Sequence, residues 1–485
     1  MLALIAALQA SPVEFYGFGA RRMGRAGGGT AIADGPESVL SNPASLPGMN
    51  APELSVGVVY GDTAFRQFPE LYWDTNQDGV IDAGDKHLKM GPNYDPTAGV
   101  MIGAALPLGK RVAVGLGLYV PPTRLLRLQT FEPQLPSYFL YENRTQRYEL
   151  GMGVGVRPIW GLSLGAGLQM IPKAKFTLDA TLNATVSGSG EEDSATDLVG
   201  LELDVHSMML DLVPGIAPNL AFHWDAGQAI PVLKGLYVGA SWRGEAGLPV
   251  DVTLNLQANI KTEDIEDLES VLLPLVLSLQ MGLYDHYVPS QWNFGVAYSI
   301  KNRLTLSADL RRTGWNKLRI NIADVVSSSL EGAATDFGKN PVKDGNPYDI
   351  ELEATWAPRV GADLRLPEIK TKTALGNIGI RMRAGFGYEP TPLVSQSAAT
   401  VVLDADRLIF GAGLGVEHLN PFWRGETGAE RLVRWDGFLQ YHMLATGELV
   451  RPEPEQPTAG YAVDGAAIPI GGHLLAAGAQ WSFQY

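Results

Sequence analysis

The sequence has 485 residues, of which 56 are glycine and none is cysteine, and its formal net charge is −15. The lack of cysteine excludes a disulfide scaffold, a thiol nucleophile and every cysteine-ligated metal site. The acidic balance, with no basic tract, argues against a nucleic-acid partner, because phosphate binding depends on clustered lysine and arginine. Glycine exceeds its usual share of about 7%, and it occurs within apolar, strand-like segments rather than in linkers.

The first ten residues predict the remnant of a secretory signal. Residues 1–10 (MLALIAALQA) are apolar and end in alanine, although they contain no lysine or arginine of the kind that opens a secretory signal. A frayed apolar terminus is the alternative. No stretch of the sequence reaches the ~20 apolar residues that a membrane-spanning helix needs. An exported chain without such a helix is either soluble or a β-barrel.

Residues 11–51 are rich in glycine, partly charged and without alternation. Such a segment is too irregular to face lipid, where every backbone polar group needs an internal partner. If the remainder of the chain forms a barrel, this segment is expected within the lumen.

Residues 74–85 match the D-x-N-x-D-G-x-I-D pattern of a calcium-binding loop. Oxygen ligands at positions 1, 3 and 5, a backbone carbonyl at position 7 and a glycine for the sharp turn suit Ca²⁺. Position 12 holds aspartate where an EF-hand has glutamate, and an acidic solvated loop is the alternative. The predicted ligands are Asp74, Asn76, Asp78, Val80, Asp82 and Asp85.

Segments of period two fill residues 52–485 and predict strands. Trp292, Phe294 and Val296, for example, alternate with Gln291, Asn293 and Gly295. Many of these segments run to about ten residues, the length that a tilted strand needs to cross a bilayer. We therefore predict an all-β fold, a transmembrane antiparallel β-barrel of about 14 strands. The predicted strands lie near residues 53–62, 97–107, 111–120, 145–157, 161–185, 202–224, 233–262, 286–300, 302–324, 349–366, 377–390, 405–418, 431–447 and 471–485.

The predicted connections differ in length between the two ends of the barrel. Those after the second, fourth and eighth strands are tight, whereas those over 63–96, 120–144, 263–285, 325–348 and 448–470 are long. Short turns at one end and long extracellular loops at the other are typical of outer-membrane barrels.

One long connection predicts a helix. Thr262 can cap it, acidic residues fill its first turn, and an apolar stripe follows at helical spacing, although Pro274 would kink it. The stripe would either contact an apolar substrate or pack the loops over the barrel mouth. Its candidate substrate-binding residues are Leu268, Leu272, Leu275, Val276 and Leu279.

No enzyme site can be assembled from the sequence. Gly161-Leu-Ser163-Leu-Gly165 matches G-x-S-x-G, but the alternation continues through it, whereas a nucleophile elbow needs a strand, a turn and a helix. The seven histidines show no metal-binding spacing. Four charged residues are predicted to face the lumen: Asp309, Arg311, Arg381 and Arg383. They could bind the carboxylate of a substrate, or they could pair with one another and with residues 11–51.

The sequence resembles the FadL family of outer-membrane channels. The resemblance is carried by Gly24-Arg25-Ala26, by Ala31-Ile32-Ala33-Asp34, and by Asn42-Pro43-Ala44, followed by echoes at Trp315, over 383–388 and over 404–407. The last strand, with alternating Trp481, Phe483 and Tyr485, resembles the signal that the outer-membrane insertion machinery reads. The resemblance to the family implies that residues 11–51 form a hatch that plugs a fourteen-stranded barrel over residues 52–485. It also implies lateral release of the cargo through the barrel wall.

The resemblance implies passive uptake of long-chain fatty acids or other hydrophobic small molecules across the outer membrane of a Gram-negative bacterium. Outer-membrane lipids would surround the barrel, and no cofactor would be required beyond possible Ca²⁺ in the first extracellular loop. A general polar porin, an outer-membrane lipid-hydrolysing enzyme and a purely structural barrel are the alternatives.

Overall fold

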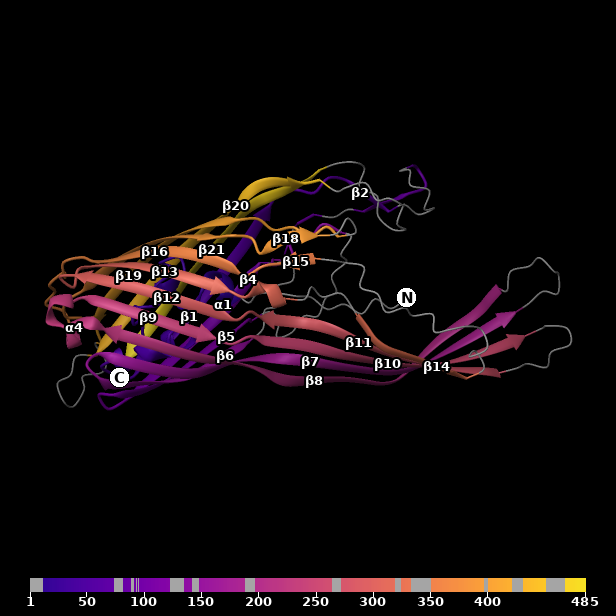
Figure 1. The fold of residues 1–485 in the computed structure, drawn as a ribbon, viewed down its shortest axis with the longest axis horizontal. Helices are drawn as coiled ribbons and strands as arrows, with labels where there is room; N and C mark the ends of the chain where they lie inside the picture. The colour runs from indigo at the N-terminus through magenta and orange to yellow at the C-terminus, as the bar shows by residue number, and fades with distance from the viewer. Residues whose placement is uncertain are drawn as a thin grey trace.

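Fourteen strands form one closed antiparallel barrel, as predicted. The computed structural model describes residues 12–73, 82–88, 91–92, 94, 96–122, 135–141, 148–187, 197–263, 272–318, 324–332, 350–396, 400–420, 431–450 and 467–485. The predicted signal remnant lies outside these residues. The first strand, β1 (Glu53–Phe65), pairs with β4 and also with the last strand, β21 (Ile468–Gln484), which closes the barrel. Its tilted strands fill the left half of Figure 1.

The barrel strands match the predicted segments in order, with boundaries that differ by a few residues and with some segments divided. The remaining strands of the barrel are β4 (Thr97–Leu108), β5 (Val112–Val120), β6 (Glu149–Ile159), β7 (Leu162–Ser187), β8 (Asp197–Asp225), β9 (Leu236–Arg243), β12 (Gln291–Ile300), β13 (Leu304–Thr313), β16 (Thr355–Arg365), β17 (Gly379–Glu389), β19 (Arg407–Leu419) and β20 (Leu432–Leu449). Each pairs antiparallel with its neighbours.

Alternation separates an apolar outer face from a polar inner face. On β12, Trp292 and Phe294 are each 43% exposed on the outside, whereas Gln291 and Asn293 are 8% and 7% exposed on the inside. Successive side chains of a strand point to opposite faces, so one strand can meet lipid on one side and a polar interior on the other. The last strand follows the same rule, with Trp481 outside and stacked on Trp435 of β20.

Tight turns join the strands at one end of the barrel, as predicted. Trp160 and Gly161 between β6 and β7, and Lys301 and Asn302 between β12 and β13, all have positive φ. Such backbone suits a two-residue hairpin, because it follows the twist of the strands. The connection between β8 and β9 is longer and holds α4 (Ala226–Ala229) and η2 (Pro231–Leu233).

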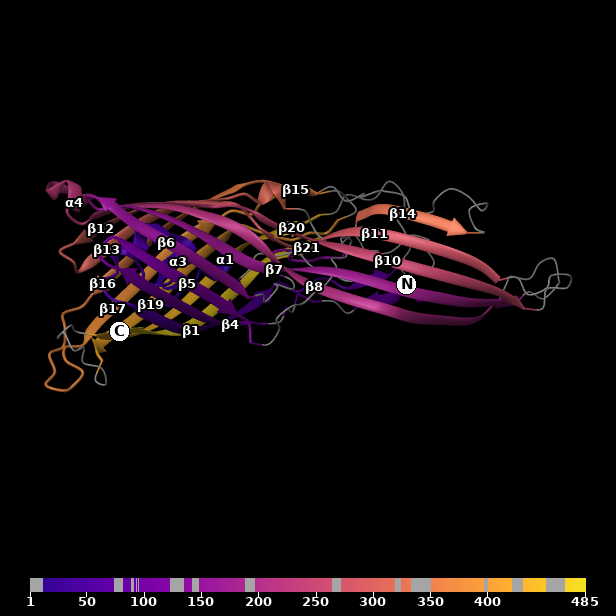
Figure 2. The ribbon, with the colours of Figure 1, turned by 90° about the horizontal axis from the view of Figure 1, so that it is seen from below.

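An arm projects from the opposite end of the barrel. It consists of the outer parts of β7 and β8 together with β10 (Ala246–Glu263), β11 (Leu272–Val288) and β14 (Asp324–Gly332). β10 pairs in parallel with β7, and β11 pairs antiparallel with both β10 and β14. Figures 1 and 2 show these strands extending away from the barrel. The predicted strand over 233–262 is therefore divided, and only β9 belongs to the barrel.

The helix predicted after Thr262 is wrong over residues 272–283. This stretch is strand β11, in which Pro274 lies opposite Asn259 of β10 and beyond the end of the pairing with β14. A proline is tolerated where one edge of a strand is free. The apolar run over 272–277 fits a strand as well as a helix, and there the neighbouring strands decide. Over 277–283, leucine and methionine alternate with Ser278, Gln280 and Gly282, as in a strand.

Smaller elements complete the mouth at the arm end. β2 (Leu71–Trp73) pairs with β3 (Lys86–Leu88), and β15 (Ile350–Leu352) pairs with β18 (Leu393–Gln396). The 3₁₀ helix η3 (Trp315–Lys317) follows β13. Among the described residues, no helix has the length and hydropathy of a membrane span.

Residues 12–48, which we call the N-terminal segment, run inside the barrel. They contain α1 (Pro12–Tyr16), α2 (Ala20–Met23), α3 (Ser38–Ser41) and the 3₁₀ helix η1 (Pro43–Gly48). The segment contacts walls on different sides of the lumen: the backbone of Gly29 and Thr30 bonds to Asp309 of β13, and Arg21 bonds to Asp436 of β20. Figure 2 shows α1 and α3 among the barrel strands.

Candidate functional site: the lumen and its mouth

Glycines of the inner wall allow the N-terminal segment to lie against the strands. A Cβ atom at Gly155 would lie 2.5 Å from the Pro43 carbonyl oxygen, and one at Gly411 would lie 2.5 Å from the Ala26 nitrogen. A Cβ atom at Gly165 would overlap the backbone of Ala44. These three wall glycines therefore leave space that the backbone of the segment fills.

The Asn42-Pro43-Ala44 motif fixes the segment to the wall. The Asn42 side chain donates to the Thr30 carbonyl at 2.9 Å and to the Phe222 carbonyl of β8 at 3.0 Å, and it accepts from the Ala44 nitrogen at 3.1 Å. One amide thus joins two parts of the segment to the barrel and caps η1. Pro43 occupies the first turn of that helix, where its missing N–H needs no partner.

Buried ion pairs hold the charged residues of the segment. Arg21 contacts Asp436 at 2.9 Å and Glu53 at 3.2 Å, and Arg25 pairs with Asp34 of the segment itself. Arg383 of β17 joins Asp436 at 2.7 Å. Removing one partner of a buried pair typically costs about 3–5 kcal/mol, because the other charge stays desolvated.

The charged residues that the sequence predicts in the lumen form ion pairs or hydrogen bonds in the structure. Arg381 faces Glu417 at 3.6 Å, Asp309 accepts the N–H groups of Gly29 and Thr30, and Arg311 donates to Asn293 at 3.1 Å. Ser163 lies within β7 and accepts from Arg157, so no nucleophile elbow forms.

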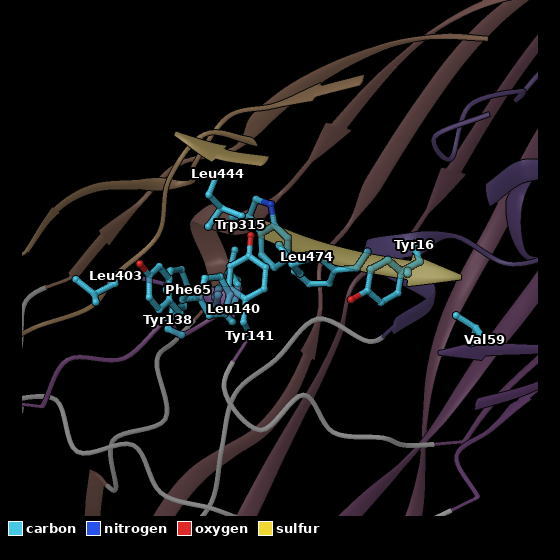
Figure 3. Packing of buried hydrophobic residues seen from close by; sticks show 14 of the residues in the cluster. Tyr16, Val59, Phe65, Tyr138, Leu140, Tyr141, Trp315, Leu403, Leu444 and Leu474 are labelled. Carbon is cyan, nitrogen blue, oxygen red and sulfur yellow. The ribbon is translucent and has the colours of Figure 1, made fainter. Parts of the chain in front are cut away.

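A cluster of buried apolar side chains, which we call the apolar cluster, continues from the N-terminal segment to the barrel mouth. Figure 3 shows Tyr138, Phe65, Leu140 and Tyr141 crowded together, with Tyr16 farther along the same side. Lipid-like molecules partition into such surroundings, because apolar surface leaves water. Members include Phe15, Tyr16, Phe18, Met23, Phe65, Tyr138, Phe139, Leu140, Tyr141, Trp315, Val401, Val402, Leu403, Leu444 and Leu474.

A cavity of about 40 Å³ adjoins the apolar cluster. Its apolar side is formed by Val13, Phe18 and Leu40, which belong to the cluster or pack against it. This volume holds a few water molecules at about 10–15 Å³ each, or one group of similar size. The rest of the lining is polar and consists of Gly17, Arg22, Ser41, Asn219, Ser241, Arg243, Gln291, Asn293 and Arg311.

Arg22 is the unusual member of this lining. It is 6% exposed, and among the described residues its guanidinium has no hydrogen-bond or ion-pair partner. Burial, followed by repulsion from Arg311, lowers the pKa of Arg22 to about 10 against the weaker attraction of Asp309 and Asp34, which still leaves it charged at pH 7. Buried cations are normally paired. The arrangement is therefore suited to an anionic group.

Arg22 was not among the residues that the sequence singled out. Consecutive side chains on a helix diverge by about 100°, so when Arg21 of α2 turns to Asp436 and Glu53, Arg22 turns to the cavity. The Arg21-Arg22 pair in an otherwise glycine-rich segment was the available signal.

The remaining predicted site residues fall mainly outside the described part of the chain. Asp74, Asn76, Asp78, Val80 and Leu268 lie outside it. Asp82 and Asp85 form a turn in which the Asp82 nitrogen donates to the Asp85 carboxylate at 2.9 Å. The other candidate apolar residues, Leu272, Leu275, Val276 and Leu279, are positions of strand β11 in the arm.

Asp404, at the mouth, predicts a pH effect on the stability of this region. It is 7% exposed, and burial raises its pKa to about 6, against opposing effects of the Thr391 hydroxyl and Arg407. A raised carboxyl pKa means that the folded mouth favours the protonated form, so its stability falls as pH rises from about 4 to about 6. We expect Asp404→Asn to remove this loss, on the order of 2 kcal/mol, above pH 6.

Hydrogen exchange of residues 400–406 at pH 4 and 7.5 measures this effect. Protection should rise in Asp404→Asn at pH 7.5 only. Asp406→Asn is the matched control, because Asp406 already accepts from Tyr388 at 2.6 Å and from the Thr391 nitrogen at 2.9 Å. An equal gain of protection in Asp404→Asn and Asp406→Asn would contradict the raised pKa of Asp404 as the cause.

Comparisons with known proteins agree with this architecture. The family described as "Outer membrane protein transport protein (OMPP1/FadL/TodX)" matches residues 3–351. A Pseudomonas aeruginosa FadL homologue of known structure has 14% identity and a TM-score of 0.56, covering 96% of this chain and 98% of its own. The P. putida toluene transporter TodX has 13% identity and a TM-score of 0.49, covering 97% and 99%. No curated protein matches the sequence.

Proposed function

Because the chain belongs to the OMPP1/FadL/TodX family of outer-membrane transport proteins, we propose that it is a passive channel for the uptake of long-chain fatty acids. Membership makes it a transport protein of a Gram-negative outer membrane and not an enzyme. Beyond this family membership, we propose the cargo, the direction of transport and the function of the N-terminal segment as a hatch.

The observation that carries the proposal is the contact between the apolar cluster and the Arg22 cavity. A fatty acid has a long apolar chain and one carboxylate. The cluster offers buried apolar surface from the mouth inwards, and the cavity beside Phe18 and Leu40 offers the Arg22 guanidinium, which has no hydrogen-bond or ion-pair partner within the described part of the chain. A neutral hydrocarbon would leave that cation desolvated and unpaired, which is costly. Arg22 therefore favours an acid over a hydrocarbon.

Transport would require the N-terminal segment to move. The segment contacts opposite walls of the barrel, and the cavity of about 40 Å³ is far smaller than a long-chain fatty acid. We propose that cargo at the cavity displaces the segment and that this opens the way inwards. Among the described residues each barrel strand pairs with both of its neighbours, so lateral release would need a further change in the wall.

Uptake by intact cells tests the proposal. A Gram-negative host without its own fatty-acid channel is supplied with radiolabelled fatty acid, with and without the gene. We expect uptake to depend on the gene and to fall when an unlabelled fatty acid competes. Equal uptake in both strains would rule out fatty acids as cargo, and a hydrocarbon of the same length would then be the next substrate to measure.

The rival reading as a general polar porin gives a different result. A porin shows large, stable conductance in planar bilayers, whereas a lumen filled by residues 12–48 predicts almost none. The buried ion pairs of Arg21 and Arg25 support the expectation of almost no conductance.

We also propose that residues 74–85 bind Ca²⁺, on the strength of their ligand pattern. Isothermal titration of the purified protein should show calcium binding that Asp74→Ala and Asp78→Ala each weaken by at least tenfold, since carboxylates at positions 1 and 5 are direct ligands. Asp62→Ala, an exposed aspartate on β1, is the control. Unchanged heats in the loop variants would exclude the site.

A further inference from the structure

Residues 135–141, which we call the mouth segment, lie among the apolar cluster at the mouth of the barrel. Residues 137–141 are at most 4% exposed. The Ser137 nitrogen donates to the Val401 carbonyl at 3.1 Å, and the Ser137 carbonyl accepts from the Leu403 nitrogen at 2.8 Å. The Tyr138 ring stacks on Phe65 with centroids 4.1 Å apart, as Figure 3 shows.

Arg407, at the start of β19, touches the mouth segment and the N-terminal segment at once. Its guanidinium lies 4.2 Å from the Phe15 ring centroid, and it donates to the Tyr141 hydroxyl at 3.2 Å. The rings of Phe15 and Tyr141 are themselves 5.2 Å apart. Arg407 is 5% exposed, so these cation–π and hydrogen-bond contacts are made with little competition from water.

An ion chain continues from Arg407 to a turn of the N-terminal segment. Glu389 of β17 contacts Arg407 at 2.9 Å and Arg359 of β16 at 2.8 Å. Arg359 then donates to the Ala26 carbonyl at 2.9 Å. These four residues link the mouth to the interior through buried contacts.

The turn at the end of this chain has a conformation that its sequence does not favour. Ala26 has a φ of 54°, in the left-handed region that residues with a Cβ atom seldom adopt, and Gly27 follows with a φ of 78°. Asp309 holds the next part of the turn by accepting from the Gly29 and Thr30 nitrogens at 2.8 and 2.7 Å. Wall side chains therefore keep the turn in a strained shape.

We propose that Arg407 and Glu389 couple closure of the mouth to docking of the N-terminal segment. When an arriving molecule displaces Tyr141, Arg407 loses its hydrogen bond to the Tyr141 hydroxyl. The Phe15 ring loses its contact with the Tyr141 ring. Glu389 then interacts more with Arg407 and less with Arg359. Arg359 is positioned less firmly, and its hydrogen bond to the Ala26 carbonyl weakens. A buried ion pair responds as a unit, because no member can be left unpaired cheaply. This coupling goes beyond the proposed function and applies to any cargo.

The cysteine-free sequence allows a direct test with single reporters. Ser137→Cys reports on the mouth and Thr30→Cys on the turn; these residues are 4% and 1% exposed, so maleimide labelling requires opening. For each substitution, the labelling rate is measured at the reporter cysteine on the other side of the chain of contacts. Tyr141→Phe, which removes only the hydroxyl, should speed labelling at position 30 about tenfold. Arg359→Lys should speed labelling at position 137 to a similar degree.

Arg407→Lys keeps the charge but loses the planar fork, and it should speed labelling at both reporters. Arg365→Lys is the control, because Arg365 is partly exposed and pairs with Glu368 at 2.7 Å and Glu417 at 3.1 Å, which are not part of the chain from Arg407 to Ala26; it should change neither rate. Heat-modifiable migration verifies the barrel, and Glu389→Gln replaces Arg359→Lys if that variant does not assemble. The proposal is overturned if each change affects only its nearest reporter. Labelling needs no cargo, so failed fatty-acid uptake would not affect this result.

Discussion

Arg22→Met should weaken fatty-acid binding about 10- to 100-fold while leaving a long-chain alcohol of equal length within about twofold. A hydrogen bond to a charged group contributes about 1.5–3 kcal/mol, and both the charge and the donors are lost in this variant. The alcohol keeps the apolar contacts with Phe18 and Leu40 beside the cavity. Competition with a fluorescent fatty acid on the purified protein measures both affinities.

Stability separates this effect from general damage. Arg22 has no ion-pair partner among the described residues, so Arg22→Met should leave the barrel as stable as the wild type or more stable. Arg383→Met is the matched contrast, because it removes the Arg383 contacts of Asp436 at 2.7 Å and of Asp363 at 2.9 Å and so leaves two largely buried carboxylates with one cation fewer, and it should cost about 3–5 kcal/mol. Equal losses of acid and alcohol binding in Arg22→Met would count against an anionic head group.

Gly165→Ala combined with Gly155→Ala should displace the N-terminal segment and open the channel to small polar solutes. The added methyl groups would meet the backbone of Ala44 and Pro43, which cannot rotate away as a side chain can. Overpacking typically costs about 1–3 kcal/mol per site. We therefore expect at least a tenfold rise in solute flux in a liposome-swelling assay, together with trypsin cleavage after Arg21 or Arg25.

Gly437→Ala is the control for this pair. Gly437 lies on β20, and a Cβ atom there would come no closer than 3.9 Å to the Gly478 carbonyl oxygen. It should change neither flux nor cleavage. A closed, protease-resistant channel in the Gly155 and Gly165 double variant would show that the segment tolerates the contacts, and the role of wall glycines in docking would have to be abandoned.

Local patterns in the sequence determined the barrel. Strand β12 alternates Trp292 and Phe294 with Gln291 and Asn293, and that alternation alone assigns its two faces, because side chains of a strand alternate by geometry. The tight turn at Lys301 and the terminal strand to Tyr485 follow from the same short-range rules. The Asn42-Pro43-Ala44 motif marked the N-terminal segment, which the structure places in the lumen with Asn42 as its anchor to β8.

Tertiary structure alone decided the features that depend on distant partners. Residues 272–277 contain no polar side chain, so their period cannot distinguish a helix from a strand, and the pairing of this stretch with β10 and β14 settles it. Arg21 and Arg22 are identical in type and adjacent in sequence, yet one meets Asp436 and the other a cavity. The chain that joins Tyr141, Arg407 and Ala26 spans three distant parts of the sequence. Such differences arise from which wall residue a side chain faces, and only the closed barrel fixes that.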